Sequence, residues 1–222
     1  MLSLKYNSEN QFEIGIDEAG RGPLFGRLYV AAVIIPEGGF DNPAIKDSKK
    51  IKSKKKMTDL AEYIKTNAYA WSIKYIDHDV IDDINILQSV YQGMHASIRE
   101  CISKINVFEH QTCLLIDGNL FKPFSVFDES TDRLMTLPYE TIEGGDNKYQ
   151  AIAAASILAK SARDQWVEDL CIEYPLLSER YALNKNMGYG TKAHLNGIAQ
   201  YGITQWHRKT YGCCKTAPYQ PI

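Results

Sequence analysis

The chain has 222 residues, is 45% hydrophobic and 23% charged, and carries a formal net charge of -2. Its length suits one α/β domain with a full core, and the weak negative charge excludes nucleic-acid binding through overall charge, so any such binding must be local. Five cysteines without metal-type spacing, no secretory leader and no apolar run near ~18 residues predict a cytoplasmic protein that does not contact a membrane.

The first predicted element is a short apolar strand from Phe12 that runs into two adjacent acids, Asp17 and Glu18. A glycine-arginine-glycine turn at residues 20–22 follows, and its backbone can approach a ligand closely. Two carboxylates beside a cation suggest phosphate chemistry assisted by metal ions. Neighbours on a regular strand point to opposite faces, so we expect the strand to end or bulge at Glu18, or Glu18 to bind through its main-chain carbonyl. We predict that the carbonyl takes part.

The next segments predict a covered sheet and a basic loop. Leu28–Ile35 is a nearly continuous apolar run, typical of a central strand that forms a hairpin with the first. Seven of residues 46–56 are lysines, which indicates either a solvated loop or a phosphate-contacting patch. Ser53 is the expected N-cap of a helix to about Thr66. Its buried stripe is expected to be Met57, Leu60, Ala61 and Ile64.

Residues 70–76 alternate like a half-exposed strand, and a short helical segment capped by Asp77 or Asp79 follows. A long amphipathic helix is predicted over 85–105. Further along, residues 120–138 are expected to be an irregular surface excursion without chemistry.

Two more acids follow predicted strands. The buried run 112–117 ends in Asp117, and a short strand at 139–142 leads to Asp146 on a glycine turn. Carboxylates gathered with Asp17 at strand ends make a cluster of hard oxygen ligands, which suits Mg²⁺ or Mn²⁺.

A long helix is predicted from Lys148 to about Glu173, and its alanine-rich first half permits close packing on a sheet or a ligand. Four polar residues fall at helical spacing on one face: Ser156, Lys160, Arg163 and Asp164. This face is either solvated, with an internal Lys160–Asp164 pair, or lies beside Asp146 and bound phosphates.

Tyr189 stands between two glycines, before a helix that begins after Thr191 and ends near Gly202. Core packing does not explain an aromatic side chain on so permissive a backbone. Such a residue is suited to stacking on a base or a sugar.

Seven motifs, taken together and in this order, resemble the ribonuclease HII family. The resemblance spans residues 15–211, and the first motif combined with the alanine-rich helix is highly specific. The motifs are Asp17–Pro23, Asp47–Lys50, Ile116–Gly118, Gly145–Asp146, Ile152–Lys160, Arg163–Asp164 and Gly188–Thr191.

The resemblance implies a ribonuclease H-like α/β fold, a mixed sheet flanked by helices with a C-terminal helical substrate-binding segment. It implies an endonuclease dependent on Mn²⁺ or Mg²⁺ that hydrolyses the RNA strand of RNA/DNA hybrids. It also implies nicking 5′ of ribonucleotides embedded in duplex DNA by two-metal-ion catalysis, which leaves 5′-phosphomonoesters and serves ribonucleotide and primer removal.

The resemblance also implies roles for individual residues. The catalytic, metal-binding carboxylates are Asp17, Glu18, Asp117 and Asp146. The ribose-sensing turn is Gly20, Arg21 and Gly22, Tyr189 stacks on a sugar, Lys49, Ser156 and Lys160 contact phosphates, and Asp164 is an auxiliary acid. We expect a monomer with a single domain over 1–222, in which 176–222 forms the substrate-binding extension.

Three positions depart from the family pattern, and two other functions stay open. Arg27, Ile51 and Met187 replace the usual residues, and the 29 positions from Asp117 to Asp146 are more than in many members. The alternatives are a catalytically silent hybrid-binding protein and another ribonuclease H-like nuclease, such as a junction resolvase.

Overall fold

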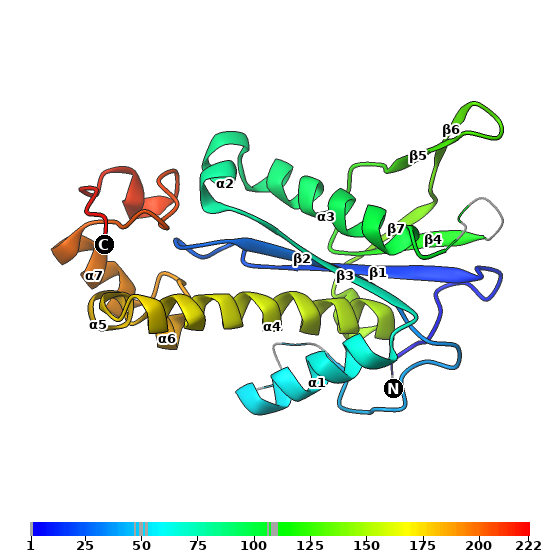
Figure 1. Ribbon diagram of the computed structural model, residues 1–222, viewed down its shortest axis with the longest axis horizontal. Helices are drawn as coiled ribbons and strands as arrows, with labels where there is room; N and C mark the ends of the chain where they lie inside the picture. The colour runs from blue at the N-terminus through cyan, green and yellow to red at the C-terminus, as the bar shows by residue number, and fades with distance from the viewer. Residues whose placement is uncertain (1, 47, 49–50, 52, 106, 108–110) are drawn as a thin grey trace.

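The computed structural model consists of a five-stranded mixed sheet, of order β3-β2-β1-β4-β7, between two layers of helices (Figure 1). It describes residues 2–46, 48, 51, 53–105, 107 and 111–222. The sheet strands are β1 (Phe12–Ala19), β2 (Leu28–Ile34), β3 (Ala70–Ile76), β4 (Thr112–Asp117) and β7 (Tyr139–Ile142). The helices are α1 (Lys54–Asn67), α2 (His78–Ile84), α3 (Ile86–Ile102), α4 (Gln150–Glu173), α5 (Leu176–Tyr181), α6 (Leu183–Asn186) and α7 (Lys192–Tyr201). The α/β fold expected from the sequence is therefore confirmed.

Strand β1 pairs antiparallel with β2 and parallel with β4. Its register with β2 is continuous through Asp17, Glu18 and Ala19, so the first of the two alternatives, a strand that ends or bulges at Glu18, is excluded. Because side chains alternate along a strand, Asp17 lies on the same face as Gly15, and Glu18 lies on the other.

Helix α4 lies very close to the face of β1 that carries Gly15 and Asp17. A Cβ atom at Gly15 would lie only 2.2 Å from the carbonyl carbon of Ala151, so only glycine fits there. The alanines at 153–155 are fully buried, as the predicted close packing requires. This contact carries the polar face of α4 toward the end of β1 where Asp17 lies.

The helices on the two faces of the sheet follow the sequence predictions closely. Ser53 caps α1 by accepting a hydrogen bond from the N–H of Lys56, and Asn85 caps α3. Helix α3 ends at Ile102, earlier than predicted, and covers one face of the sheet, whereas α1 and α4 cover the other (Figure 1). The four predicted residues of α1 are all buried.

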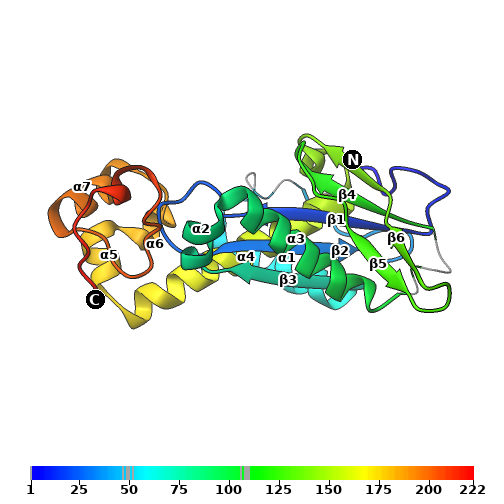
Figure 2. The same cartoon turned by 90° about the horizontal axis from the view of Figure 1, so that it is seen from above.

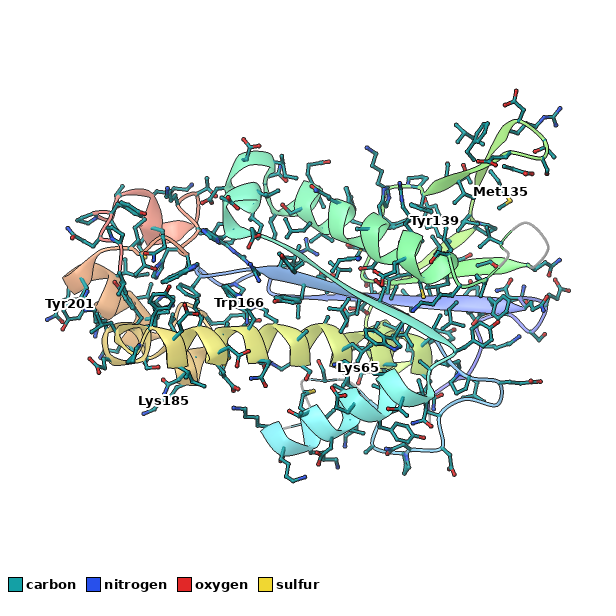
Figure 3. All side chains as sticks on the ribbon, in the orientation of Figure 1. Lys65, Met135, Tyr139, Trp166, Lys185 and Tyr201 are labelled. Atoms are coloured by element: carbon teal, nitrogen blue, oxygen red, sulfur yellow. The ribbon has the colours of Figure 1, made fainter. Side chains whose placement is uncertain are left out.

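The sequence suggested that residues 120–138 are irregular. This is wrong, because they contain a two-stranded hairpin. Strands β5 (Ser125–Asp128) and β6 (Arg133–Thr136) pair antiparallel. Figure 3 shows Met135 on this hairpin, which projects from the body of the molecule. Phe124 and Leu137 flank the hairpin and are buried, so they anchor it to the core.

The C-terminal helices α5, α6 and α7 lie beyond one end of the sheet (Figure 2). They share a core with Phe25, which lies in the loop between β1 and β2 and is fully buried. Trp166 of α4 points toward this loop (Figure 3), and a Cβ at Gly26 would lie 2.4 Å from its ring. The loop after the two acids is thus held between α4 and the C-terminal segment. Among the described residues, none of the helices has the length and apolar character to span a membrane.

Candidate active site

The end of β1 opens into a pocket of about 240 Å³. It brings together residues that the sequence places up to 172 positions apart, between Asp17 and Tyr189. The predicted site residues that line it are Asp17, Glu18, Gly20, Arg21, Gly22, Asp117, Ser156, Lys160, Asp164 and Tyr189. Asp146 does not line the pocket, and Lys49 lies outside the described residues.

Asp17 is the most buried acid of the pocket, with 6% of its surface exposed. Its Oδ1 accepts a hydrogen bond from the N–H of Glu18 at 2.7 Å. Burial raises the pKa of Asp17 well above its usual range, and the carboxylates of Glu18 and Asp117 raise it further. The pocket therefore concentrates negative charge that a cation would stabilise.

Glu18 reaches the same pocket from the opposite face of β1, because the pocket lies at the end of the strand. Its Oε1 forms an ion pair with Nη1 of Arg21 at 3.3 Å. Burial raises the pKa of Glu18, and the charge of Arg21 opposes this rise. Beyond Ile16, the described part of the chain provides no strand partner on the β4 side of β1.

Asp117 and Asp146 are connected through the turn between them. Asp117 ends β4, and its Oδ1 accepts a hydrogen bond from the N–H of Gly145 at 2.7 Å. Asp146 belongs to a short 3-10 helix just before α4 and is 2% exposed. Its Oδ1 accepts a hydrogen bond from the amide of Asn147 at 2.9 Å. Asp146 thus lies one residue from a direct partner of Asp117.

The donor atoms of this site fit a hard divalent cation. They are carboxylate oxygens, and no thiol or imidazole is found among the described residues that line the pocket. In the conformation described for residues outside the gaps at 47–52 and 106–110, no three such side chains converge on one ion position. Asp17, Glu18 and Asp117 instead accept hydrogen bonds from other groups of the protein, so their side chains would have to rotate to bind one ion together.

The polar face of α4 forms one wall of the pocket. Nζ of Lys160 pairs with Oδ2 of Asp164 at 2.6 Å, and Lys160 is one-third exposed. The hydroxyl of Ser156 lies 2.9 Å from that of Ser48. The predicted Lys160–Asp164 pair is present, but the face is not solvated throughout, because Ser156 is buried. The face lines the pocket together with Asp17, Glu18 and Asp117, whereas Asp146, the acid named in the prediction, does not line it.

Tyr189 also lines the pocket, and 47% of its surface is exposed. A Cβ at Gly22 would lie 3.8 Å from its ring, so the ring lies beside the glycine-arginine-glycine turn. The guanidinium of Arg163 lies 5.6 Å from the ring centre, and its Nη2 donates to the carbonyl of Met187 at 2.7 Å. The ring is therefore exposed on a backbone that buried groups hold in place.

Two buried histidines form a hydrogen-bonded chain that ends at the main-chain carbonyl of Tyr189. Nδ1 of His194 donates to the carbonyl of Tyr189 at 3.0 Å, and its Nε2 lies 3.0 Å from Nε2 of His207. Nδ1 of His207 accepts from the N–H of Thr204, so His207 carries its proton on Nε2 and donates to His194. The sequence did not indicate this pair, because two histidines 13 positions apart have no diagnostic spacing.

Comparisons with known proteins show the family to which the chain is similar. The family model described as Ribonuclease HII matches residues 14–214. Ribonuclease HII of Parabacteroides distasonis is 42% identical over 210 residues, which cover 95% of this chain and 94% of that protein.

Two solved structures share the fold. Ribonuclease H2 from Pyrococcus horikoshii OT3 aligns with a TM-score of 0.69 at 20% identity, covering 92% of this chain and 96% of that one. The structure of Bst-RNase HIII in complex with Mn²⁺ aligns with a TM-score of 0.62 at 16% identity, covering 85% and 70%. At these identities, the likeness shows the fold alone.

Proposed function

The chain belongs to the ribonuclease HII family, and from this premise we propose that its pocket cuts duplex DNA on the 5′ side of embedded ribonucleotides. Membership of the family makes the protein a metal-dependent endoribonuclease that acts on RNA/DNA hybrids. Cleavage at a single ribonucleotide, and its use in ribonucleotide and primer removal, are the finer parts of the proposal.

One observation carries the proposal: four acids, a glycine-arginine-glycine turn and an exposed tyrosine line the same small pocket. The acids Asp17, Glu18 and Asp117 provide ligands for cations, and Asp146 is bonded through its turn to Asp117. We assign the catalytic and metal-binding roles to these four residues. Divalent cations bound there would polarise the attacking water and neutralise charge on the phosphate and on the departing 3′ oxygen.

Other residues position the scissile phosphate. Lys160 and Ser156 extend from α4 into the pocket, where an ammonium and a hydroxyl suit phosphate oxygens. Asp164 orients the ammonium of Lys160 through their 2.6 Å ion pair. We also propose a phosphate contact for Lys49, which lies outside the described residues.

Glu18 is proposed to contribute its main-chain carbonyl as well as its carboxylate. The absence of a strand partner on the β4 side of β1 after Ile16, within the described chain, supports this role. Arg21 holds the Glu18 carboxylate at the edge of the pocket.

Selectivity for RNA is proposed to arise at the 20–22 turn. Among the described residues, none accepts a hydrogen bond from the N–H of Arg21 or of Gly22. A ribose 2′-OH both accepts and donates, so it can pair with such donors, whereas deoxyribose cannot. Tyr189, beside the turn, would stack on the neighbouring sugar.

The remaining parts of the proposal concern the whole protein. The divalent cation is Mn²⁺ or Mg²⁺, because these ions prefer octahedral sites made of oxygen ligands such as carboxylates. We further propose a cytoplasmic monomer with one catalytic domain, in which residues 176–222 form a substrate-binding extension. The shared core of this extension with Phe25 supports its coupling to the turn.

A nicking assay with Mg²⁺ and Mn²⁺ in parallel tests the proposal. The substrates are duplex DNA with one ribonucleotide, a continuous RNA/DNA hybrid and a four-way DNA junction. We expect cuts 5′ of the single ribonucleotide and within the hybrid, with the junction left intact. Activity on the hybrid alone would overturn the embedded-ribonucleotide proposal, and hybrid binding without any cut would identify a silent binding protein.

A further inference from the structure

Arg208 lies directly behind the 20–22 turn and has no solvent exposure. Its guanidinium donates to three main-chain carbonyls of the loop between β1 and β2. Nη2 donates to Gly20 at 2.6 Å, Nη1 to Arg21 at 3.0 Å and Nε to Gly26 at 2.9 Å. A planar guanidinium presents donors in a fixed fan, so these bonds define the orientation of the loop as well as its position.

The bonds to Gly20 and Arg21 determine where the next two N–H groups point. In a trans peptide the C=O and the following N–H point in opposite directions. The carbonyl of Gly20 shares its peptide with the N–H of Arg21, and the carbonyl of Arg21 shares its peptide with the N–H of Gly22. Because Arg208 draws both carbonyls inward, both N–H groups face away from it, on the side where Gly20, Arg21 and Gly22 line the pocket.

Tyr211 completes the arrangement. Its hydroxyl donates to the carbonyl of Arg21 at 3.1 Å, so that oxygen accepts from two groups. The guanidinium of Arg208 lies 5.0 Å from the Tyr211 ring centre. Burial lowers the pKa of Arg208 to about 10, which leaves it charged at neutral pH. The carbonyls therefore face a permanent cation.

We propose that Arg208 is a positioning residue for ribose selectivity: it aims the N–H groups of Arg21 and Gly22 at the position of the substrate 2′-OH. The role rests on the proposed function of the 20–22 turn. Arg208 touches no substrate and acts only through the peptide units that it holds. A lysine cannot replace it, because one ammonium cannot donate to all three carbonyls in the planar arrangement that the guanidinium provides.

The test measures how strongly binding depends on one ribose. In a full-length Asp17→Asn background, which prevents cutting, dissociation constants are measured for two duplexes. One duplex is all DNA, and the other has the same sequence with one ribonucleotide. The ratio of the two constants is the ribose preference. It is measured for the parent, for Arg208→Lys, for Tyr211→Phe and for the control Arg180→Lys, whose guanidinium lies over Tyr201 within the C-terminal segment.

We expect the ribose preference to fall at least about tenfold in Arg208→Lys and about threefold in Tyr211→Phe. In both variants the N–H groups of the turn would point away from the 2′-OH and lose their hydrogen bonds to it. Affinity for the all-DNA duplex should change little, and Arg180→Lys should retain the parental ratio. A purely structural role for Arg208 would lower the melting temperature or weaken both duplexes equally. A folded Arg208→Lys variant with the parental ratio would overturn the proposal.

Two other outcomes are also decisive. If Arg208→Lys does not fold, Tyr211→Phe decides, since it alters the same carbonyl from a partly exposed position: a lower ratio supports the proposal, and an unchanged ratio overturns it. A parent without any ribose preference would overturn the proposed function of the turn, and the role of Arg208 with it. If only the positioning role of Arg208 is wrong, the parent still shows a ribose preference and the variants share it.

Discussion

The N–H of Gly145 donates a 2.7 Å hydrogen bond to Oδ1 of Asp117, and this bond joins the end of β4 to the turn that carries Asp146. The same turn leads into α4, which packs on β1 beside Asp17. All four acids are therefore attached to one frame of packed strands and one helix. A change in the Asp117–Gly145 hydrogen bond or in the packing of α4 on β1 should alter the distances between the acids.

Replacing Asp17 by Asn should abolish cleavage while leaving hybrid binding largely intact. The substitution removes the charge of the most buried carboxylate in the pocket and preserves its shape. We expect the turnover number on an RNA/DNA hybrid to fall at least about a thousandfold, as when other catalytic groups are removed. Asp59→Asn, on the exposed side of α1, is the control and should keep normal activity. Retained turnover in Asp17→Asn would remove Asp17 from the mechanism.

Divalent cations should stabilise the fold as well as support activity. Bound cations relieve the repulsion among Asp17, Glu18 and Asp117, so Mn²⁺ should raise the melting temperature and EDTA should reverse the rise. At about 100 times the dissociation constant, the stabilisation is about 2.7 kcal/mol. Asp117→Asn should reduce this shift, whereas Asp128→Asn on the hairpin should not. Equal shifts in both variants would place the cation elsewhere.

Gly20→Ala should destabilise the protein more than Gly38→Ala. Both glycines have positive φ, 103° and 79°, so both substitutions strain the backbone by about 1 kcal/mol or more. A Cβ at Gly20 would also lie 2.5 Å from Nε of Arg163, whereas a Cβ at Gly38 has open space. Urea unfolding measures both variants. Equal losses of unfolding free energy would show that the contact with Arg163 costs nothing.

Lys160→Gln should weaken binding to an RNA/DNA hybrid through the loss of one phosphate contact. The slope of log affinity against log salt should become less steep by about one, since one fewer counterion is released. Lys65→Gln removes a charge from α1, where Lys65 pairs with Glu62, and serves as the control. Binding titrations at several salt concentrations measure both slopes. An unchanged slope in Lys160→Gln would place Lys160 away from the phosphates.

Stability should fall as the pH is lowered through the range where unfolded histidine takes up a proton. Burial and the nearby His194 lower the pKa of His207 to about 3 in the folded protein. The unfolded chain binds this proton near pH 6.5, so the contribution of neutral His207 is complete above that pH and is lost on acidification. We expect a loss of about 2 kcal/mol between about pH 7.5 and pH 5.

Urea unfolding of a His207→Gln variant at both pH values provides the test. The pH dependence should be smaller than in the parent, whatever the absolute stability of the variant. His95→Gln, in which the replaced ring packs against Phe121 and Phe124, is the control and should retain the parental dependence. The same pH dependence in His207→Gln and the parent would show that other groups cause the loss.

Local patterns predicted most of the sheet and its covering helices. The buried stripe of α1, its Ser53 cap and the antiparallel hairpin of β1 and β2 all follow from periodicity, capping and turn chemistry within short segments. The prediction failed at residues 120–138, where β5 and β6 form a hairpin of weakly patterned, largely exposed residues. It also missed α5 and α6, which are only 6 and 4 residues long and depend on tertiary packing.

The sequence by itself indicated the chemistry that we propose for this protein, because the acids, the 20–22 turn and Tyr189 are recognisable from residue type and order. Only the tertiary structure decided how these groups are aimed. The pairing of β1 with β2 continues past Glu18 without a bulge, and Arg208 reaches the carbonyl of Gly20 across 188 positions of the chain. Such contacts depend on how the C-terminal segment packs against the loop after β1, and no local pattern encodes that packing.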